Sequence, residues 1–268
     1  MSKTGTIRVG IGGWTYEPWR GTFFPEKWPQ ARELDYAASK LTAIEVNGTY
    51  YGSQKPATFA AWAKAAPDGF VFSLKASRFC TNRRVLAEGD ASVEKFLGQG
   101  IVELGDKLGP ILWQFMATKM FDPDDFSAFL QLLPAERDGV KLTHIVDVRH
   151  ESFKDPAFIA LVRKAGVSVV HTDSPDYPAI GDASGPVSYA RLMNAREEEP
   201  TGYAPAEIER WTQVAQVWAA GETGDAFPLA APDVPGTKAP RDVFVFYING
   251  AKVRAPHAAM ATIEALKA

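Results

Sequence analysis

The sequence predicts an α/β fold of the TIM-like (β/α)8 barrel type, and two observations lead to this prediction. Eight short runs rich in Val, Ile and Phe recur along the 268 residues, as expected of buried parallel strands. Helical patterns separate most of these runs, and the length suits one barrel domain over residues 1–268. An open doubly wound sheet is the alternative. The predicted strands are Ile7–Gly12, Thr42–Asn47, Phe70–Lys75, Pro110–Phe115, His144–Arg149, Val167–Thr172, Val187–Leu192 and Val243–Asn249.

The helices are predicted from their apolar faces and from the residues at their ends. A proline can occupy the first turn of each, because its missing N–H is not needed there. Two of these prolines follow an aspartate that can cap the helix, and a glycine stands where two of the helices should end. The prolines are Pro56, Pro123, Pro156, Pro205 and Pro256, the capping residues are Asp122 and Asp155, and the terminating glycines are Gly166 and Gly221.

Two connections depart from the strand–helix alternation. Only residues 173–186 separate the sixth and seventh strands, and their Pro, Gly and Asp content makes a helix doubtful. Residues 221–241 form a long Pro/Gly/Ala-rich loop before the last strand. A loop of that length is expected to be either functional or mobile.

Composition excludes several classes of protein. The formal net charge is −3, so the basic excess of a non-specific nucleic-acid or anionic-membrane binder is missing. Cys80 is the single cysteine, which excludes an internal disulfide and a thiolate-rich zinc site. No apolar run approaches the roughly 18–20 residues that span a bilayer, and residues 1–8 lack a signal-peptide core. We therefore expect a cytoplasmic protein that has no membrane partner and does not bind nucleic acid non-specifically.

Polar side chains gather at the carboxyl ends of the predicted strands. Side chains alternate along a strand, and directing the large apolar ones toward the helices leaves polar ones pointing inward. The active sites of such barrels lie at this end. The inward positions are Glu45 and Asn47, Ser73 and Lys75, Gln114, Asp147 and Arg149, His171 and Asp173, Tyr189 and Arg191, Tyr247 and Asn249, with Gly10 and Gly12 in the first strand.

Six of these residues are charged, three of each sign. Desolvating a charge costs several kcal/mol unless it is paired, so a shared site requires a charge-balanced ring. The ring could be a structural salt-bridge network, or it could bind a small anionic ligand through Arg149 and Arg191. The carboxylates are Glu45, Asp147 and Asp173, and the cations are Lys75, Arg149 and Arg191.

Aromatic residues follow the first two strands at the same end. They could pack together as the core of a lid, or some could stack on a planar or sugar-like ligand. They are Trp14, Tyr16, Trp19, Phe23, Phe24, Tyr50 and Tyr51.

An ordered series of motifs extends over nearly the whole chain. It begins Gly12-Gly13-Trp14-x-Tyr16-x-x-Trp19, continues through Glu45-x-Asn47-x-x-Tyr50-Tyr51 and Arg149-His150-x-Ser152-Phe153, and ends near Tyr247-x-Asn249. The series resembles the YecE-like family, also called domain of unknown function 72. The resemblance implies a TIM-like barrel and no established reaction. Asn82 stands where that family usually has a histidine, and Gly250-Ala251 replaces a usual asparagine and aspartate.

The candidate catalytic residues are four of the barrel-end charges. Glu45 is the preferred general base, and Lys75 is either an electrophilic stabiliser or a Schiff-base nucleophile. Asp147 and Asp173 complete the set. A metal on Glu45, Asp147, His171 and Asp173 is conceivable, but the interleaved cations already neutralise these groups, so no metal or other cofactor is expected. The candidate ligand-binding residues are Trp14, Tyr16, Asn47, Tyr51, Gln114, Arg149, Arg191 and Asn249.

Three functions follow from this interpretation. The first is an enzyme that uses acid–base chemistry, without a redox cofactor, on a small anionic molecule that is sugar-like, carboxylated or phosphorylated. Its reaction would be a hydrolysis, an elimination or an isomerisation. The second is a non-catalytic module that binds a metabolite or a nucleic-acid end, and the third is a purely structural charge network. The sequence does not predict the oligomeric state.

Overall fold

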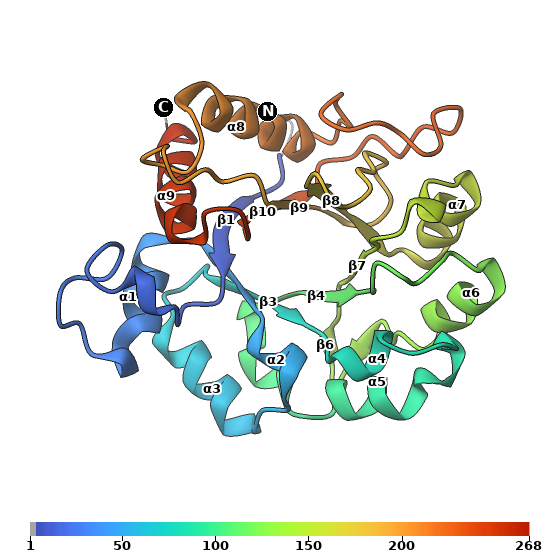
Figure 1. Cartoon of the computed structure of the whole chain (residues 1–268). Helices are drawn as coiled ribbons and strands as arrows, with labels where there is room; N and C mark the ends of the chain where they lie inside the picture. Colours follow the sequence, from blue (N-terminus) through green and yellow to red (C-terminus); the bar gives the residue numbers. More distant parts are fainter. Residues whose placement is uncertain (1–3, 268) are drawn as a thin grey trace.

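Residues 4–267 are described by the computed structural model, and within them eight parallel strands close into a barrel (Figure 1). Strand β1 pairs with both β2 and β10, so the sheet has no open edge. This closure confirms the predicted (β/α)8 barrel. The strands are β1 (Ile7–Gly12), β2 (Ala43–Val46), β3 (Val71–Lys75), β4 (Leu108–Gln114), β7 (His144–Asp147), β8 (Ser168–Asp173), β9 (Val187–Leu192) and β10 (Asp242–Tyr247), and a hairpin of β5 (Glu136–Arg137) and β6 (Val140–Lys141) lies outside the barrel.

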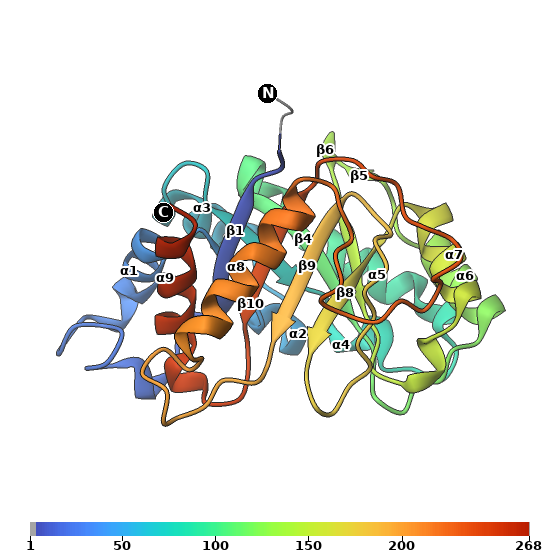
Figure 2. The same cartoon turned by 90° about the horizontal axis from the view of Figure 1, so that it is seen from above.

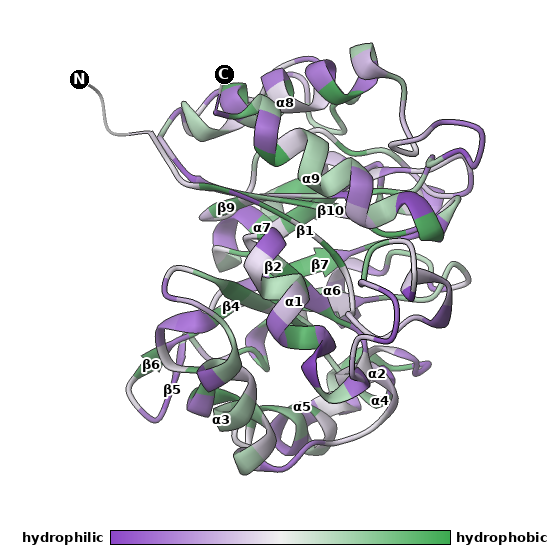
Figure 3. Ribbon diagram, turned by 90° about the vertical axis from the view of Figure 1, so that its left-hand side faces the viewer, coloured by the Kyte–Doolittle hydropathy of each residue, from purple (hydrophilic) through white to green (hydrophobic). Residues whose placement is uncertain are grey.

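Helices surround the strands, and the apolar colour is concentrated on the strands that they enclose (Figure 3). The helices are α1 (Glu33–Lys40), α2 (Gly48–Tyr51), α3 (Pro56–Ala65), α4 (Arg78–Thr81), α5 (Asp90–Leu97), α6 (Pro123–Gln131), α7 (Pro156–Ala165), α8 (Pro205–Ala219) and α9 (Ala255–Ala265). Short 3-10 turns occupy Glu17–Trp19, Gln30–Arg32, Leu86–Gly89, Ile101–Lys107, Glu151–Phe153 and Lys252–Arg254. None of the helices within residues 4–267 has both the length and the hydropathy to cross a membrane.

The predicted helix ends are formed by the expected groups. The carboxylate of Asp122 accepts hydrogen bonds from the first N–H groups of α6, and Asp155 does the same for α7. Gly166 ends α7 with a φ of 66°, a left-handed conformation that glycine adopts without steric cost.

The middle of the barrel is filled by aromatic side chains from β10, contrary to the prediction that they face the helices. Phe244 and Phe246 point inward and pack against Tyr189. The reason lies in β1, where Gly10 pairs with Phe246. A Cβ atom on Gly10 would lie 1.9 Å from the carbonyl oxygen of Ala43 and 3.1 Å from the Phe246 ring. Because the glycines of β1 have no side chains, the two phenylalanine rings have room inside the barrel.

Tyr247 consequently faces the helices, so its predicted inward direction is wrong. Its hydroxyl lies 2.6 Å from that of Thr262 in α9, and its ring contacts Tyr203. Burial raises the pKa of Tyr247 above its usual value. Asn249, two residues further along, is exposed beyond the strand and does not reach the barrel interior.

The helix-free connection between β8 and β9 is covered by residues 221–241. Figures 1 and 2 both place this segment between α8 and α7. Phe227 stacks parallel to His171 with 5.9 Å between ring centroids, and the buried Asp182 carboxylate accepts the N–H groups of Ala230 (2.6 Å) and Ala231 (3.1 Å). The absence of a helix in residues 173–186 is as predicted, and the long loop replaces the helix as cover for β8.

Candidate functional site

Arg191 is the centre of a buried ion network at the carboxyl ends of the strands. Its Nε and Nη2 atoms donate to the two oxygens of Glu45, each at 3.0 Å, and its Nη1 atom donates to Asp147 Oδ2 at 2.7 Å. Arg191 is only 2% exposed, and both carboxylates are fully buried. The three side chains come from β9, β2 and β7, which barrel closure brings together.

Glu45 is held as the counter-ion of Arg191. Its Oε2 atom accepts a further hydrogen bond of 2.8 Å from the Tyr189 hydroxyl, which also lies 2.9 Å from Ser73 Oγ. Burial, with the neighbouring Glu45 charge, raises the pKa of Tyr189 well above its usual value. Because both Glu45 oxygens already have donors, this geometry favours a positioning role over the general-base role predicted for it.

Asp147 differs from Glu45 in having one oxygen free. Its Oδ2 atom accepts from Arg191 and also from Arg149, whose Nη2 and Nε atoms lie at 3.2 and 3.3 Å. Its Oδ1 atom is buried and has no hydrogen-bond partner within residues 4–267. A buried acceptor without a partner carries the full cost of its desolvation, so it is suited to accept a hydrogen bond from a ligand N–H or O–H group.

Arg149 has donors available at the outer edge of the network. Its Nη2 atom donates to Gln114 Oε1 at 2.8 Å, and its guanidinium lies 4.2 Å from the ring centroid of Tyr177. Its Nη1 atom makes no hydrogen bond to the described residues, and the side chain is 14% exposed. These N–H groups can therefore bind a carboxylate or a phosphate.

Lys75 is a buried cation without an ionic partner. It is 7% exposed, and no described carboxylate lies within 4.0 Å of its Nζ atom. The Nζ atom lies 4.1 Å from the ring centroid of Tyr50, a contact that stabilises positive charge. Burial, and next the Arg191 charge, lower the pKa of Lys75 from 10.5 to about 8, although Glu45 and Asp147 oppose this effect.

Asp173 and His171 point away from this network, so their predicted inward directions are wrong. In β8 the inward positions belong to Val170 and Thr172, and Thr172 pairs with Arg191. His171 stacks on Trp218 at 4.6 Å, and its Nδ1 atom lies 2.8 Å from the carbonyl oxygen of Ile180. Burial raises the pKa of Asp173, and the neighbouring Asn194 side chain opposes this effect.

The prediction of a charge-balanced ring is therefore wrong. Two carboxylates, Glu45 and Asp147, face three cations, Lys75, Arg149 and Arg191. The possible metal ligands are also divided between the two faces of the sheet. Within residues 4–267 no three His, Cys, Asp or Glu side chains are grouped to hold a metal ion.

The aromatic residues after β1 serve two different purposes. Trp19, Phe23 and Phe24 are buried against one another, as a lid core requires. Tyr16 packs on Trp19 and lies 4.7 Å from the Lys252 ammonium. Three other ligand-binding candidates, Trp14, Asn47 and Tyr51, line a hollow of about 340 Å³ at the ends of β1 and β2, together with Gly12, Trp62 and Lys252.

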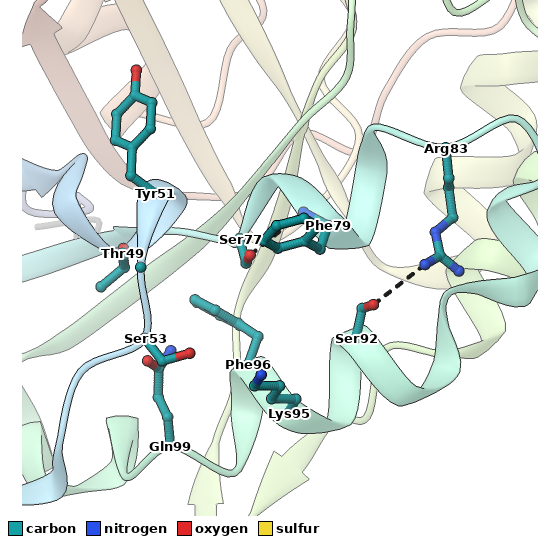
Figure 4. Close-up of a pocket in the computed structure, with 11 residues that line it drawn as sticks. Thr49, Tyr51, Ser53, Ser77, Phe79, Arg83, Ser92, Lys95, Phe96 and Gln99 are labelled. Atoms are coloured by element: carbon teal, nitrogen blue, oxygen red, sulfur yellow. Dashed lines mark hydrogen bonds between the residues drawn. The ribbon is translucent and has the colours of Figure 1, made fainter.

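A second hollow of about 340 Å³ lies between α2, α4 and α5 (Figure 4). It combines hydroxyl groups, two cations and the Phe79 and Phe96 rings, and one cation, Arg83, donates to Ser92 at 3.3 Å. Thr49 joins the hollow to the ion network, because its hydroxyl donates to the carbonyl oxygen of Lys75 at 2.7 Å.

Sequence reasoning did not select two residues of the network. Tyr50 belongs to the aromatic pair Tyr50–Tyr51, and its position directly after β2 was the available signal. Tyr177 comes from the irregular connection after β8, and no sequence pattern distinguished it from the neighbouring loop residues.

Comparison with known proteins identifies the family. A protein-family model described as "Protein of unknown function DUF72" matches residues 8–268. The chain belongs to this family. The match confirms the resemblance to the YecE-like family, and a search among curated proteins gave no match.

Solved structures show the same fold. A DUF72 family protein from Thermotoga maritima MSB8 is 20% identical, with a TM-score of 0.75 over 98% of this chain and 100% of the other. A DUF72 family protein from Enterococcus faecalis V583 is 18% identical, with a TM-score of 0.72 over 98% and 96% of the two chains. SacUVDE is 8% identical, with a TM-score of 0.55 over 98% of each chain. At these identities the likeness extends to the barrel alone.

Proposed function

We propose that this DUF72 protein is an enzyme that binds a small anionic polar molecule at the carboxyl ends of the barrel strands and transforms it by acid–base chemistry. The observation that supports the proposal is the surplus positive charge there. Arg191 is saturated by the two carboxylates, which leaves the Arg149 Nη1 atom and the Lys75 amine to attract a negatively charged group.

Three side chains would bind the ligand and transfer protons. Arg149 would bind the carboxylate or phosphate of the ligand through the N–H groups of its Nη1 atom, which are charge-assisted donors. Asp147 would exchange a proton through its unpartnered Oδ1 atom, and Lys75, with a pKa of about 8, can both donate and accept a proton near neutral pH. Arg191 and Glu45 would hold Asp147 in position.

A thermal-shift screen tests the binding part of the proposal. Small carboxylated and phosphorylated sugars should raise the melting temperature of the wild type, and matched neutral sugars should not. Arg149→Met should abolish this stabilisation. Lys95→Met, which removes an exposed cation of the second hollow, should preserve it. Equal stabilisation of wild type and Arg149→Met would contradict this binding site.

Turnover separates the enzyme from a pure binding module. A stabilising ligand should be converted by the wild type but not by Asp147→Asn, which keeps the size of the side chain and removes its ability to take a proton. A ligand that stabilises the protein yet is never converted would favour the binding module. If no small anion shifts the melting temperature, the network is structural.

A further inference from the structure

We propose that Lys75 is a Schiff-base nucleophile and that the substrate is a small carbonyl compound with a carboxylate, such as a 2-oxo acid. The inference rests on the proposed function, because it takes Arg149 as the anion-binding group and adds a covalent role for its neighbour. It also chooses between the two roles that the sequence left open for this lysine.

The first argument is the lack of a counter-ion. Most buried lysines remain protonated because a carboxylate contacts them, and a protonated amine cannot attack a carbonyl. Here both nearby carboxylates are committed to Arg191, with contacts of 2.7 to 3.0 Å. The Lys75 amine is thus buried in the network without a carboxylate at contact distance.

The second argument is the set of charges that face this amine. Arg191 and Arg149 oppose its protonation, Glu45 and Asp147 favour it, and burial makes the largest contribution. The sum lowers the pKa of Lys75 to about 8. About a tenth of the amine is then neutral at pH 7, roughly two hundredfold more than for an ordinary lysine with a pKa near 10.4.

The third argument is that the neighbouring groups match the two ends of a 2-oxo acid. The Arg149 Nη1 donors suit the carboxylate, which leaves the adjacent carbonyl carbon for an amine from the same network. Thr49 fixes the backbone carbonyl of Lys75, so the side chain extends from a rigid strand end. The Tyr50 ring, 4.1 Å from Nζ, limits the space above the amine and favours a small substrate.

The proposed step is a condensation without oxidation or reduction. The neutral Nζ atom attacks the carbonyl carbon, and the electron pair of the carbonyl bond passes to its oxygen, which takes up a proton. The carbinolamine then loses its hydroxyl group as water, so one carbon–nitrogen double bond replaces one carbon–oxygen double bond. The Oδ1 atom of Asp147 is the acceptor and donor for the protons that move.

Reductive trapping tests the inference. The protein is incubated with pyruvate and sodium cyanoborohydride, and peptide mass spectrometry measures the rate of the reduced adduct on each lysine. We expect saturable labelling of Lys75 at least about tenfold faster than that of Lys252, a half-buried lysine on the same face. Lys75→Met should remove this labelling. Arg149→Met should slow labelling by pyruvate at least about tenfold more than labelling by acetaldehyde. Both reactions lose the Arg149 charge that opposes protonation of Lys75, but only pyruvate also loses a charged hydrogen bond.

The outcomes separate this inference from the function on which it rests. If carboxylates stabilise the wild type but Lys75 is labelled no faster than Lys252, the Schiff-base role is wrong and the anion site stands. If Lys75 is labelled selectively and Arg149→Met changes labelling by pyruvate and by acetaldehyde to the same extent, the choice of a 2-oxo acid is wrong. If no carboxylate stabilises the protein and Lys75 is not labelled, both proposals fail.

Discussion

Replacing Lys75 by methionine should stabilise the protein at neutral pH, by an amount that depends on pH. In the folded protein the pKa of the amine falls from 10.5 to about 8, chiefly because the side chain is buried. The unfolded chain restores the ordinary pKa. Between pH 8 and pH 10.5 the unfolded state therefore binds more protons than the folded state, and the stability of the wild type rises with pH.

The size of the effect follows from the same two pKa values. A fall from 10.5 to about 8 corresponds to about 3 kcal/mol of stability that the wild type lacks at pH 7 and regains by about pH 10.5. Methionine fills similar space and has no proton to lose. We therefore expect Lys75→Met to exceed the wild type by up to about 3 kcal/mol at pH 7, with the advantage shrinking as the pH rises.

Urea unfolding followed by circular dichroism measures this difference. Wild type and Lys75→Met are compared at pH 7 and at pH 10.5, so that the titration of all other groups cancels. Lys64→Met, which removes an exposed lysine of α3, is the control and should change stability by less than about 0.5 kcal/mol at both pH values. If the gap between wild type and Lys75→Met is the same at both pH values, the amine is not desolvated and the reasoning fails.

Three further substitutions test other parts of the structure. Arg191→Met leaves the buried Glu45 carboxylate without a cationic partner and Asp147 with Arg149 alone, and it should lower the free energy of unfolding by about 3–5 kcal/mol in urea titrations; a loss below about 1 kcal/mol would refute the buried network. Asp182→Ala should release residues 221–241, seen as faster amide exchange there and a loss of about 1–3 kcal/mol, whereas the exposed Asp176→Ala should change neither quantity. Gly10→Ala places a Cβ atom 1.9 Å from a carbonyl oxygen of the next strand, so a melting temperature equal to that of the wild type would contradict the described approach of the two strands.

The sequence was sufficient for the barrel and for most of the ion network. In β2, β3 and β4 the large apolar residues share one face, so alternation placed Glu45, Lys75 and Gln114 on the correct side. These residues belong to short strands whose order along the chain is also their order around the barrel.

Alternation was not sufficient where both faces of a strand are apolar. In β10, Val243 and Val245 alternate with Phe244 and Phe246, and the larger residues go inward only because the glycines of β1 leave space. In β8 the partner of His171 is Trp218, almost fifty positions away on α8, and no local pattern reveals such a contact. Packing between distant elements decided both cases.

The hydrogen bonds from Ala230 and Ala231 to Asp182 have a consequence for how such barrels can be recombined. Residues 221–241 donate hydrogen bonds to the Asp182 carboxylate of residues 173–186 and cover His171 of β8. Neither irregular segment can therefore be exchanged independently of the other. A chimera that takes residues 173–186 from one parent and residues 221–241 from another would leave β8 uncovered. The buried Asp182 carboxylate would also lose its hydrogen-bond donors. Engineering on this scaffold should therefore exchange residues 173–241 as a block.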